Sequence, residues 1–324
     1  MKLSQLIRYI NMVEAMNGND LRQLIYPKMQ HMVDDLTEGQ GDLEAMPGNI
    51  HALGYAIEKV KDGLGSIDVV LAGIMDDLNK ERGKLEQQAM LDSYSIYAMN
   101  AGWPDPTDFV LKELAPRSVL YNEKDIAHFR SRVRLHGSWK HAGLMIRPLT
   151  GKYIEDMLPC DPLYIVDETQ GLLAGTRQLF TPAYQRRLRY YTVNEKEQPY
   201  LTDQLPHHQL GFILVHEFFD VRPFEVIENY LKEFLTLLKP GGVVMFTFNN
   251  CDLHGPVKNF EAGLFCYTPG KLLRALVEKL GYEILAQYDS DMNVSWLEIK
   301  KPGELESMRG GQTLGKVKHV HQND

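Results

Sequence analysis

The sequence predicts an α/β fold, with a mostly parallel sheet of seven strands and a reversed last strand, preceded by an α-helical domain. The first hundred residues carry apolar residues at helical spacing, whereas the second half alternates short apolar runs with helical segments. The last two apolar runs, YEILAQY and VSWLEIK, are joined only by DSDMN. This link is too short for a crossover helix, so the pair is predicted to be antiparallel.

Length and composition limit the classes of protein to consider. The chain has 324 residues, more than one compact domain usually needs. Its formal net charge of -8 disfavours a general nucleic-acid binder, because such proteins are usually basic. The widely spaced Cys160, Cys251 and Cys266 form neither a disulfide framework nor a zinc pattern, which predicts a reducing compartment and no metal. No apolar run reaches the roughly 18 residues of a membrane span, and the N-terminus does not read as a secretory signal, so a cytoplasmic location is expected.

Residues 1–105 are predicted to form a helical domain for oligomerisation or docking. Nine apolar residues in steps of three and four make a heptad seam, which Leu85 continues after a break at Glu81: Ile50, Leu53, Ile57, Val60, Leu64, Ile67, Leu71, Ile74 and Leu78. Glycines within this stretch each weaken an isolated helix by roughly 1 kcal/mol, so the helix needs partners. The seam either contacts a second copy or another protein, which we favour, or packs on the first helices of the same chain.

Residues 106–142 are predicted to bridge the two halves. Pro104 and Pro106 interrupt the helical pattern, and a helix is expected around EKDIAHFRSRVRLHG. The bridge holds a basic run with Trp139, namely Arg130, Arg132, Arg134 and Lys140. Such a run suits nucleic acid, but it is more often a solvated face or a contact between domains.

Residues 143–302 are predicted to form the α/β domain, and 303–324 a C-terminal tail. Strands are expected at 143–146, 163–166, 190–193 and 211–215, then at VVMFTFN, YEILAQY and VSWLEIK. Helices are expected between them at 152–158, 172–188, 223–238 and 271–280. Alternation of this kind implies a sheet covered by helices on both faces.

The phrase LLKPGGVVMFTFNN resembles the helix, turn and fifth strand of class I S-adenosylmethionine (SAM)-dependent methyltransferases. Asp167 after the second strand, the turn 203–206 (DQLP) before the fourth, and the paired final strands agree with this resemblance, which covers roughly residues 120–302. The segments CDPLYIVDE, FNNCD and KKPGELESMRGGQTLGKV are similar to methyltransferase-like proteins of bacteriophages and marine bacteria. The resemblance implies a Rossmann-like methyltransferase sheet, SAM as cofactor and, for a phage protein, association with the virion.

The resemblance also implies where the cofactor binds. Family members carry an acid and then Gly-x-Gly-x-Gly after the first strand, whereas this chain has Met145, Arg147, Leu149 and Gly151 at those places. By this correspondence, Arg147, Thr150 and Gly151 contact the methionine part of SAM, and Asp167 accepts the ribose hydroxyls. Asp203 and Leu205 are expected on the adenine side. Because bulk replaces glycine, the loop is expected to weaken cofactor binding without disturbing the fold.

Polar residues after the fourth and fifth strands are the candidates for catalysis, because ligands bind at the carboxyl edge of open α/β sheets. His216 and Glu217 are expected to orient a substrate or take a proton, and Asn249 and Asn250 to position an acceptor amine or hydroxyl. The alternative is that these polar residues only line the rim of the sheet and bind no ligand. Two functions remain open: methyl transfer from SAM to an acceptor that the sequence does not identify, and a structural or assembly protein that kept the fold and lost the site.

Overall fold

The structure is a computed structural model that describes residues 2–17, 47–102, 106–109, 112, 123–147, 153–289 and 295–306. The chain divides into two compact units, Met1–Gln88 and Ala89–Asp324. This division falls inside a helix, upstream of the proline-rich segment where the sequence suggests a boundary. Within the described ranges, no helix is both long and apolar enough to cross a membrane.

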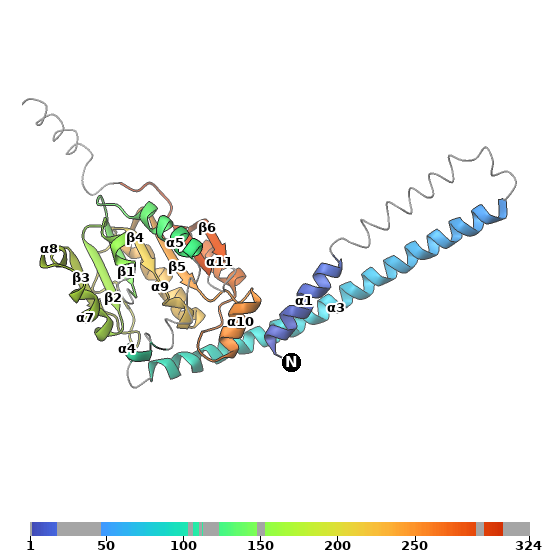
Figure 1. The fold of residues 1–324 in the computed structure, drawn as a ribbon, viewed down its shortest axis with the longest axis horizontal. Coiled ribbons are helices and arrows are strands. Elements are labelled where there is room, and N and C mark those ends of the chain that lie inside the picture. Colours follow the sequence, from blue (N-terminus) through green and yellow to red (C-terminus); the bar gives the residue numbers. More distant parts are fainter. Residues whose placement is uncertain are drawn as a thin grey trace, which may run out of the picture. The chain divides into compact units, whose positions relative to one another are not determined.

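The described part of the first unit consists of helices α1 (Leu3–Asn17) and α3 (Pro47–Ala101), which Figure 1 draws in blue to cyan. Helix α1 is amphipathic as predicted, because Leu3, Leu6, Ile7 and Ile10 are buried. Helix α3 continues through Glu81, where the heptad pattern breaks, and its residues 89–101 belong to the second unit. Most side chains of the predicted seam lie outside the described residues, so its role in oligomerisation stays a prediction.

The second unit contains a seven-strand sheet in the order β3-β2-β1-β4-β5-β7-β6. Five strands are parallel: β1 (Ala142–Ile146), β2 (Leu163–Asp167), β3 (Leu188–Thr192), β4 (Leu210–Val215) and β5 (Leu238–Phe248). Strand β7 (Ser295–Lys300) runs antiparallel to both β5 and β6 (Glu283–Asp289). This order with its reversed last strand confirms the predicted fold class, a Rossmann-like methyltransferase sheet.

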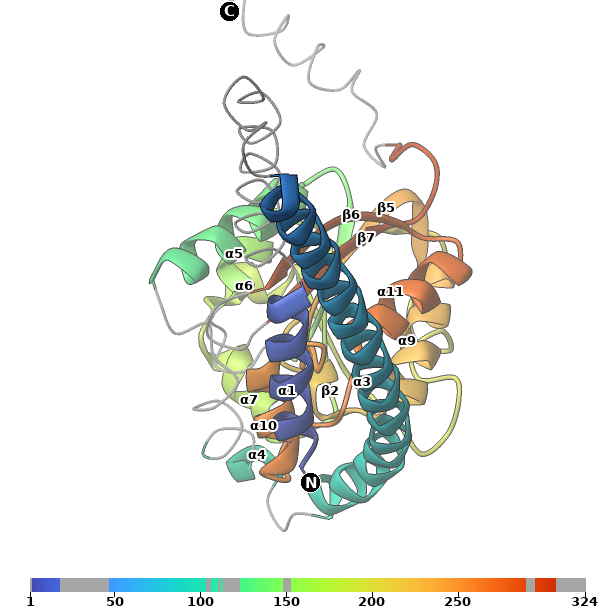
Figure 2. The same cartoon turned by 90° about the vertical axis from the view of Figure 1, so that its right-hand side faces the viewer.

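Helices cover both faces of the sheet, as Figure 2 shows. Helices α5 (Glu123–His136), α6 (Ile154–Met157) and α7 (Gln170–Gln178) pack on one face. On the other face lie α9 (Phe224–Leu237) and α11 (Gly270–Lys279). Short elements connect them: α4 (Pro106–Phe109), α8 (Pro182–Gln185), η3 (Phe219–Val221) and α10 (His254–Glu261).

The predicted helix 172–188 is wrong in its second half. Helix α7 ends at Gln178, and Pro182 begins the separate short helix α8. Proline lacks the N–H that a helix interior needs, but it fits the first position of a new helix. Leu188 already belongs to β3.

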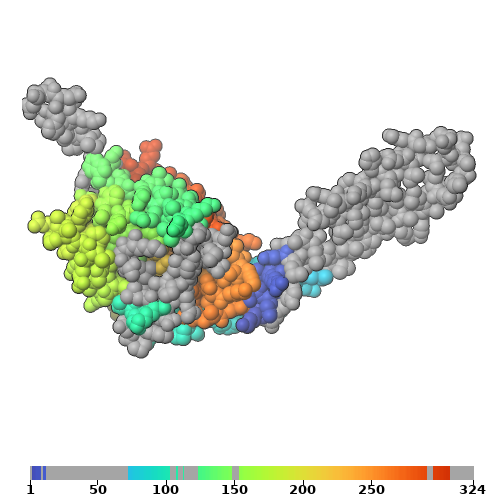
Figure 3. Space-filling model, in the orientation of Figure 1, coloured from blue at the N-terminus to red at the C-terminus, as the bar shows by residue number. Residues whose placement is uncertain are grey.

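The three arginines of the basic run form a set of ion pairs within the second unit, here called the α5 cluster: Arg130, Arg132, Arg134, His136, Asp156 and Glu298. Arg130 and Arg134 each place Nε 2.6 Å from the carboxylate of Asp156. Arg132 donates two hydrogen bonds to Glu298, of 2.7 and 2.5 Å, and His136 Nε2 lies 2.9 Å from the same carboxylate. These contacts hold α5 (green in Figure 3) on its face of the sheet, so these arginines pack a helix within one unit and do not join two domains.

Candidate active site

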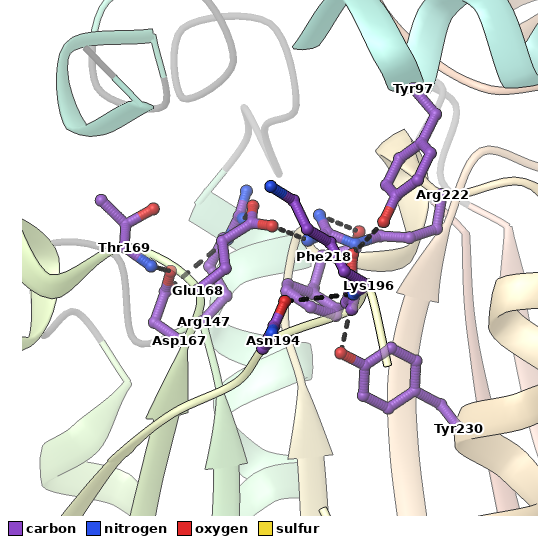
Figure 4. Close-up of polar contacts among 11 residues, drawn as sticks. Tyr97, Arg147, Asp167, Glu168, Thr169, Asn194, Lys196, Phe218, Arg222 and Tyr230 are labelled. Atoms are coloured by element: carbon purple, nitrogen blue, oxygen red, sulfur yellow. Dashed lines mark hydrogen bonds and ion pairs between the residues drawn. The ribbon is translucent and has the colours of Figure 1, made fainter. Parts of the chain in front are cut away.

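The carboxyl ends of β1, β2, β3 and β4 meet at one edge, because these strands are parallel. A chain of ion pairs and hydrogen bonds occupies this edge in Figure 4 and is called the edge network below. Its members come from the ends of β1, β2 and β3, from the end of η3 and from two helices: Arg147, Asp167, Glu168, Glu195, Arg222, Tyr97 and Tyr230.

Arg147 is the first residue after β1, and its side chain stays inside the protein. It is only 1% exposed, donates a hydrogen bond of 2.6 Å from Nη2 to Glu168, and places its guanidinium 5.0 Å from the centre of the Phe218 ring. Its Nε lies 3.5 Å from Asp167 Oδ2. Its φ of 57° is in the left-handed region that favours glycine. The backbone thus adopts a conformation suited to the glycine of the resemblance, while a guanidinium fills the adjacent space.

Arg222 extends the network from β2 to the loop after β3. Its Nη2 is 2.7 Å from Glu168, and its Nε donates to Glu195 at 3.1 Å. Its guanidinium also stacks 3.5 Å from the centre of the Phe218 ring. Glu195 in turn accepts hydrogen bonds from Tyr230 at 2.6 Å and Tyr97 at 2.5 Å. The network therefore fixes Glu168 and Glu195 through one buried arginine.

Burial and charge act in opposite directions on the carboxyl groups of this edge. Burial favours a higher pKa for Glu168, but Arg222 and Arg147 outweigh it and lower that pKa to about 2. For Asp167, burial raises the pKa and Arg147 offsets the rise only in part. Burial also raises the pKa of Asp220, beneath the network, to about 6. The carboxyl groups of Asp167, Glu168, Glu195 and Asp220 lie around the guanidinium groups of Arg147 and Arg222.

Several buried polar atoms of the edge lack a hydrogen-bond partner in the described part of the chain. Within the described part of the chain, Arg147 Nε and Nη1 and Asp167 Oδ2 have no hydrogen-bond partner. Asp167 Oδ1 accepts from the backbone N–H of Thr169 at 2.8 Å, so only one of its oxygens serves the turn after β2. A buried polar group without a partner costs about 1–3 kcal/mol, so a ligand that supplied these bonds would gain from them.

His216 and Glu217 follow β4 at the same edge, as predicted. The ring of His216 packs 4.3 Å from that of Tyr153 and 5.4 Å from that of Phe129, and its Nε2 is 3.5 Å from Glu217 Oε1. Glu217 has a φ of 51°. Arg147 and Glu217 thus place two strained residues at the ends of adjacent strands, and strain of this kind clusters at active sites.

The two asparagines after β5 are engaged in the structure of their own loop. Asn249 Nδ2 donates to the carbonyl oxygens of Pro256 and Cys266, at 3.1 and 3.0 Å. Asn250 Nδ2 donates to Asp289 at 2.9 Å. Both side chains are buried, so their observed contacts support the loop, and their positioning of an acceptor stays a prediction.

Two further predicted cofactor residues, Asp203 and Leu205, lie away from the carboxyl edge. Asp203 and Leu205 lie in the turn before β4, whose backbone continues to a hydrogen bond from His208 N to Thr236 O near the end of α9. That turn is next to the amino end of β4, so the structure separates both residues from Asp167. Asp203 is exposed and Leu205 is part of the core. Thr150 and Gly151 lie outside the described residues.

Sequence reasoning selected Arg147 and Asp167 but missed the other five members of the edge network: Glu168, Glu195, Arg222, Tyr97 and Tyr230. Glu195 follows β3 as Asp167 follows β2, so the strand-end rule that selected Asp167 identifies Glu195 too. Arg222 lies in FFDVRP, just after the predicted catalytic pair, but a lone arginine there carries no motif. Tyr97 lies on α3, 98 residues before Glu195, and no sequence pattern links the two.

No family model matches the chain, and no curated protein matches it. Among solved structures, it is similar to the N-methyltransferase NodS from Bradyrhizobium japonicum in complex with S-adenosyl-L-homocysteine (SAH). The identity is 15%, the TM-score is 0.44, and the match covers 65% of this chain and 99% of that chain. For a SAM-dependent methyltransferase from Aquifex aeolicus, the identity is 12%, the TM-score 0.40 and the coverage 64% and 97%.

A third similar structure is the [4+2]-cyclase SpnF, with 14% identity, a TM-score of 0.45 and coverage of 61% of this chain and 94% of that chain. All three TM-scores lie below 0.5, and the fold assignment depends on this chain's own strand order.

Proposed function

We propose that this chain binds SAM at the carboxyl edge of its sheet and transfers the methyl group to an acceptor. The observation that carries the proposal is the buried Asp167 at the end of β2: in the described part of the chain, neither its Oδ2 nor Arg147 Nε and Nη1 beside it has a hydrogen-bond partner. An acid at this place is suited to the two hydroxyls of a ribose, because a carboxylate accepts charge-assisted hydrogen bonds.

The charges of the edge also fit SAM. The cofactor carries a sulfonium and an ammonium group, and the carboxyl groups of this edge are suited to such cations. Arg147 supplies a partner of opposite sign for the methionine carboxylate, and Thr150 and Gly151 complete that end of the proposed site. SAM supplies the electrophilic methyl group, and the protein aligns the acceptor and removes its proton where needed.

Glu217 is the proposed proton acceptor, with His216 beside it. The two groups lie at the end of β4, next to Arg147 at the end of β1, and their ring and carboxylate are 3.5 Å apart. Asn249 and Asn250 are assigned the supporting role of holding the loop after β5, which borders the acceptor side of this edge.

The side chain of Arg147 also competes with the cofactor for Asp167. Its guanidinium pairs with Glu168 and lies beside Asp167, where the ribose would bind. SAM must therefore shift an ion pair inside the protein before it reaches Asp167. We expect a dissociation constant above the micromolar range, since each displaced charged contact costs on the order of 1.5–3 kcal/mol.

A structural or assembly protein, in a bacteriophage particle for example, is the second candidate function. The observation that favours it is the same ion pair between Arg147 and Glu168, which fills part of the edge. The heptad pattern of α3 suits a homo-oligomer or a protein partner. Light scattering on the full chain and on a Leu64→Glu, Leu71→Glu variant tests the seam. Equal masses for both, at the mass of a monomer, would count against this role of α3.

Calorimetric titration with SAM and with SAH separates the two candidates. The methyltransferase proposal expects saturable binding of both ligands that is weakened by Asp167→Ala. No heat from either ligand at millimolar concentration, with the chain folded by circular dichroism, would favour the structural candidate.

A further inference from the structure

The last three turns of α3 are built into the carboxyl edge of the second unit. Residues 89–101 belong to the same compact unit as the sheet. Ser93 is fully buried, and its Oγ accepts a hydrogen bond from the backbone N–H of Tyr267 at 2.8 Å. Asn100 Nδ2 donates to the carbonyl oxygen of Leu264 at 3.3 Å. These contacts fix the helix end on the loop that follows α10.

Two tyrosines on this helix end each donate one hydrogen bond of 2.5 Å to a carboxylate. Tyr94 contacts Glu225 at the start of α9, where both groups are largely exposed. Tyr97 contacts Glu195, which is buried and bound by Arg222 and Tyr230 as well. Burial and the Glu195 charge both raise the pKa of Tyr97, so its hydroxyl remains a donor throughout the neutral range. In Figure 4 Tyr97 reaches the network from α3, on the side opposite Tyr230.

The position of Glu195 matters because it controls an arginine. Arg222 has two acidic partners, Glu195 and Glu168, and it is 1% exposed. Glu168 in turn divides its two oxygens between Arg222 and Arg147. A change in the orientation of Glu195 therefore reaches Arg147, the residue that competes for Asp167, through direct contacts only.

We propose that Tyr97 is a positioning residue of the site: it orients Glu195, which anchors Arg222 and thereby holds Glu168 against Arg147. The consequence for ligand binding rests on the proposed function, whereas the positioning of Glu195 does not. By this proposal, helix α3 supplies a residue to the site at the sheet edge. The coupling depends on one hydroxyl group, so it can be tested by Tyr97→Phe, which removes the hydroxyl and keeps the ring.

The test compares Tyr97→Phe with Tyr94→Phe in the full chain. Each variant keeps its ring and loses one hydroxyl–carboxylate hydrogen bond of the same length, on the same helix. The first readout is amide hydrogen exchange without ligand at Lys196 and Arg222, whose N–H groups donate to Asn194 Oδ1 and Phe219 O. We expect Tyr97→Phe to speed exchange at both amides by about threefold to tenfold, the scale of one lost hydrogen bond, and Tyr94→Phe to leave them unchanged.

The second readout is the affinity for SAH, which we expect Tyr97→Phe to change by about threefold or more and Tyr94→Phe to leave within error. Unchanged exchange at Lys196 and Arg222 in Tyr97→Phe, or the same change in both variants, would overturn the positioning role. Faster exchange in Tyr97→Phe alone, with no SAH binding by the wild type, would retain that role and reject the proposed function. Should Tyr97→Phe not fold, Glu195→Gln must give the same exchange pattern at Arg222, and its failure to do so would also overturn the proposal.

Discussion

The α5 cluster and the edge network both pair arginines with buried carboxylates, but their hydrogen bonding differs. In the α5 cluster, all four carboxylate oxygens of Asp156 and Glu298 accept hydrogen bonds from Arg130, Arg132 and Arg134. In the edge network, Asp167 Oδ2 and two nitrogens of Arg147 are buried without such a partner in the described part of the chain.

The difference separates structural from functional use of the same side chains. A cluster with complete hydrogen bonding can hold a helix in place, but few of its donors and acceptors remain for a ligand. A network with open donors and an open acceptor retains binding capacity at the expense of stability. This contrast, rather than the presence of arginine, distinguishes the edge of the sheet from the basic run on α5.

The largest expected effect is on stability and follows from removing the buried arginine of the edge network. Arg222→Met leaves Glu168 and Glu195 without their shared partner, and we expect it to lower the free energy of unfolding by about 3–5 kcal/mol. The matched change Arg134→Met removes a guanidinium that is 59% exposed, while Arg130 still pairs with Asp156, so its expected cost is below about 1 kcal/mol. Urea unfolding of both variants measures the difference, and equal costs would remove the distinction between the two regions.

A smaller effect is expected on ligand affinity when the open acceptor is removed. Asp167→Ala is expected to weaken SAH binding by about 1.5–3 kcal/mol, the scale of a hydrogen bond to a charged group. Asp203→Ala is the control, because the structure places this exposed acid at the other end of β4. The measurement is calorimetric titration of SAH into both folded variants. An equal loss in the two would restore the adenine-side role that the sequence suggested for Asp203.

The α5 cluster is expected to show its role in the pH dependence of stability. Burial favours a higher pKa for Glu298, but hydrogen bonds from Arg132 and His136 outweigh it and hold the pKa at about 2, below the ordinary value of 4.5. A depressed carboxyl pKa stabilises the fold above pH 4.5, and this contribution is lost as the pH falls toward 2.

Glu298→Gln should therefore be less stable than the wild type by about 1–3 kcal/mol at pH 7, and this deficit should shrink between pH 4.5 and 2. Thermal unfolding across this range is the measurement. A deficit that stays constant with pH would mean that the contact between α5 and β7 stabilises the fold through packing and not through the charge of Glu298.

The fold was largely readable from the sequence, and the site only in part. Apolar runs such as VVMFTFN and the short link DSDMN fix strand positions and the reversed last strand by local rules. Asp167, His216 and Glu217 follow strands, so the strand-end rule finds them. Asp203 lies in a turn before a strand, whereas the strand-end rule selects residues that follow a strand, and its adenine-side role stays a prediction. Tyr97 depends on where a distant helix packs, which no local pattern determines.

The most direct test of the central claim is calorimetric titration of SAH into the full chain and into Arg147→Gly. The claim is that the edge binds this ligand in competition with the ion pairs of Arg147. Glycine suits the φ of 57° at this position and removes the competing guanidinium. We predict binding weaker than micromolar in the wild type and about tenfold tighter or better in the variant, as one charged contact is relieved. Low-micromolar binding by the wild type that Arg147→Gly leaves unchanged, or no binding by either protein, would contradict the claim.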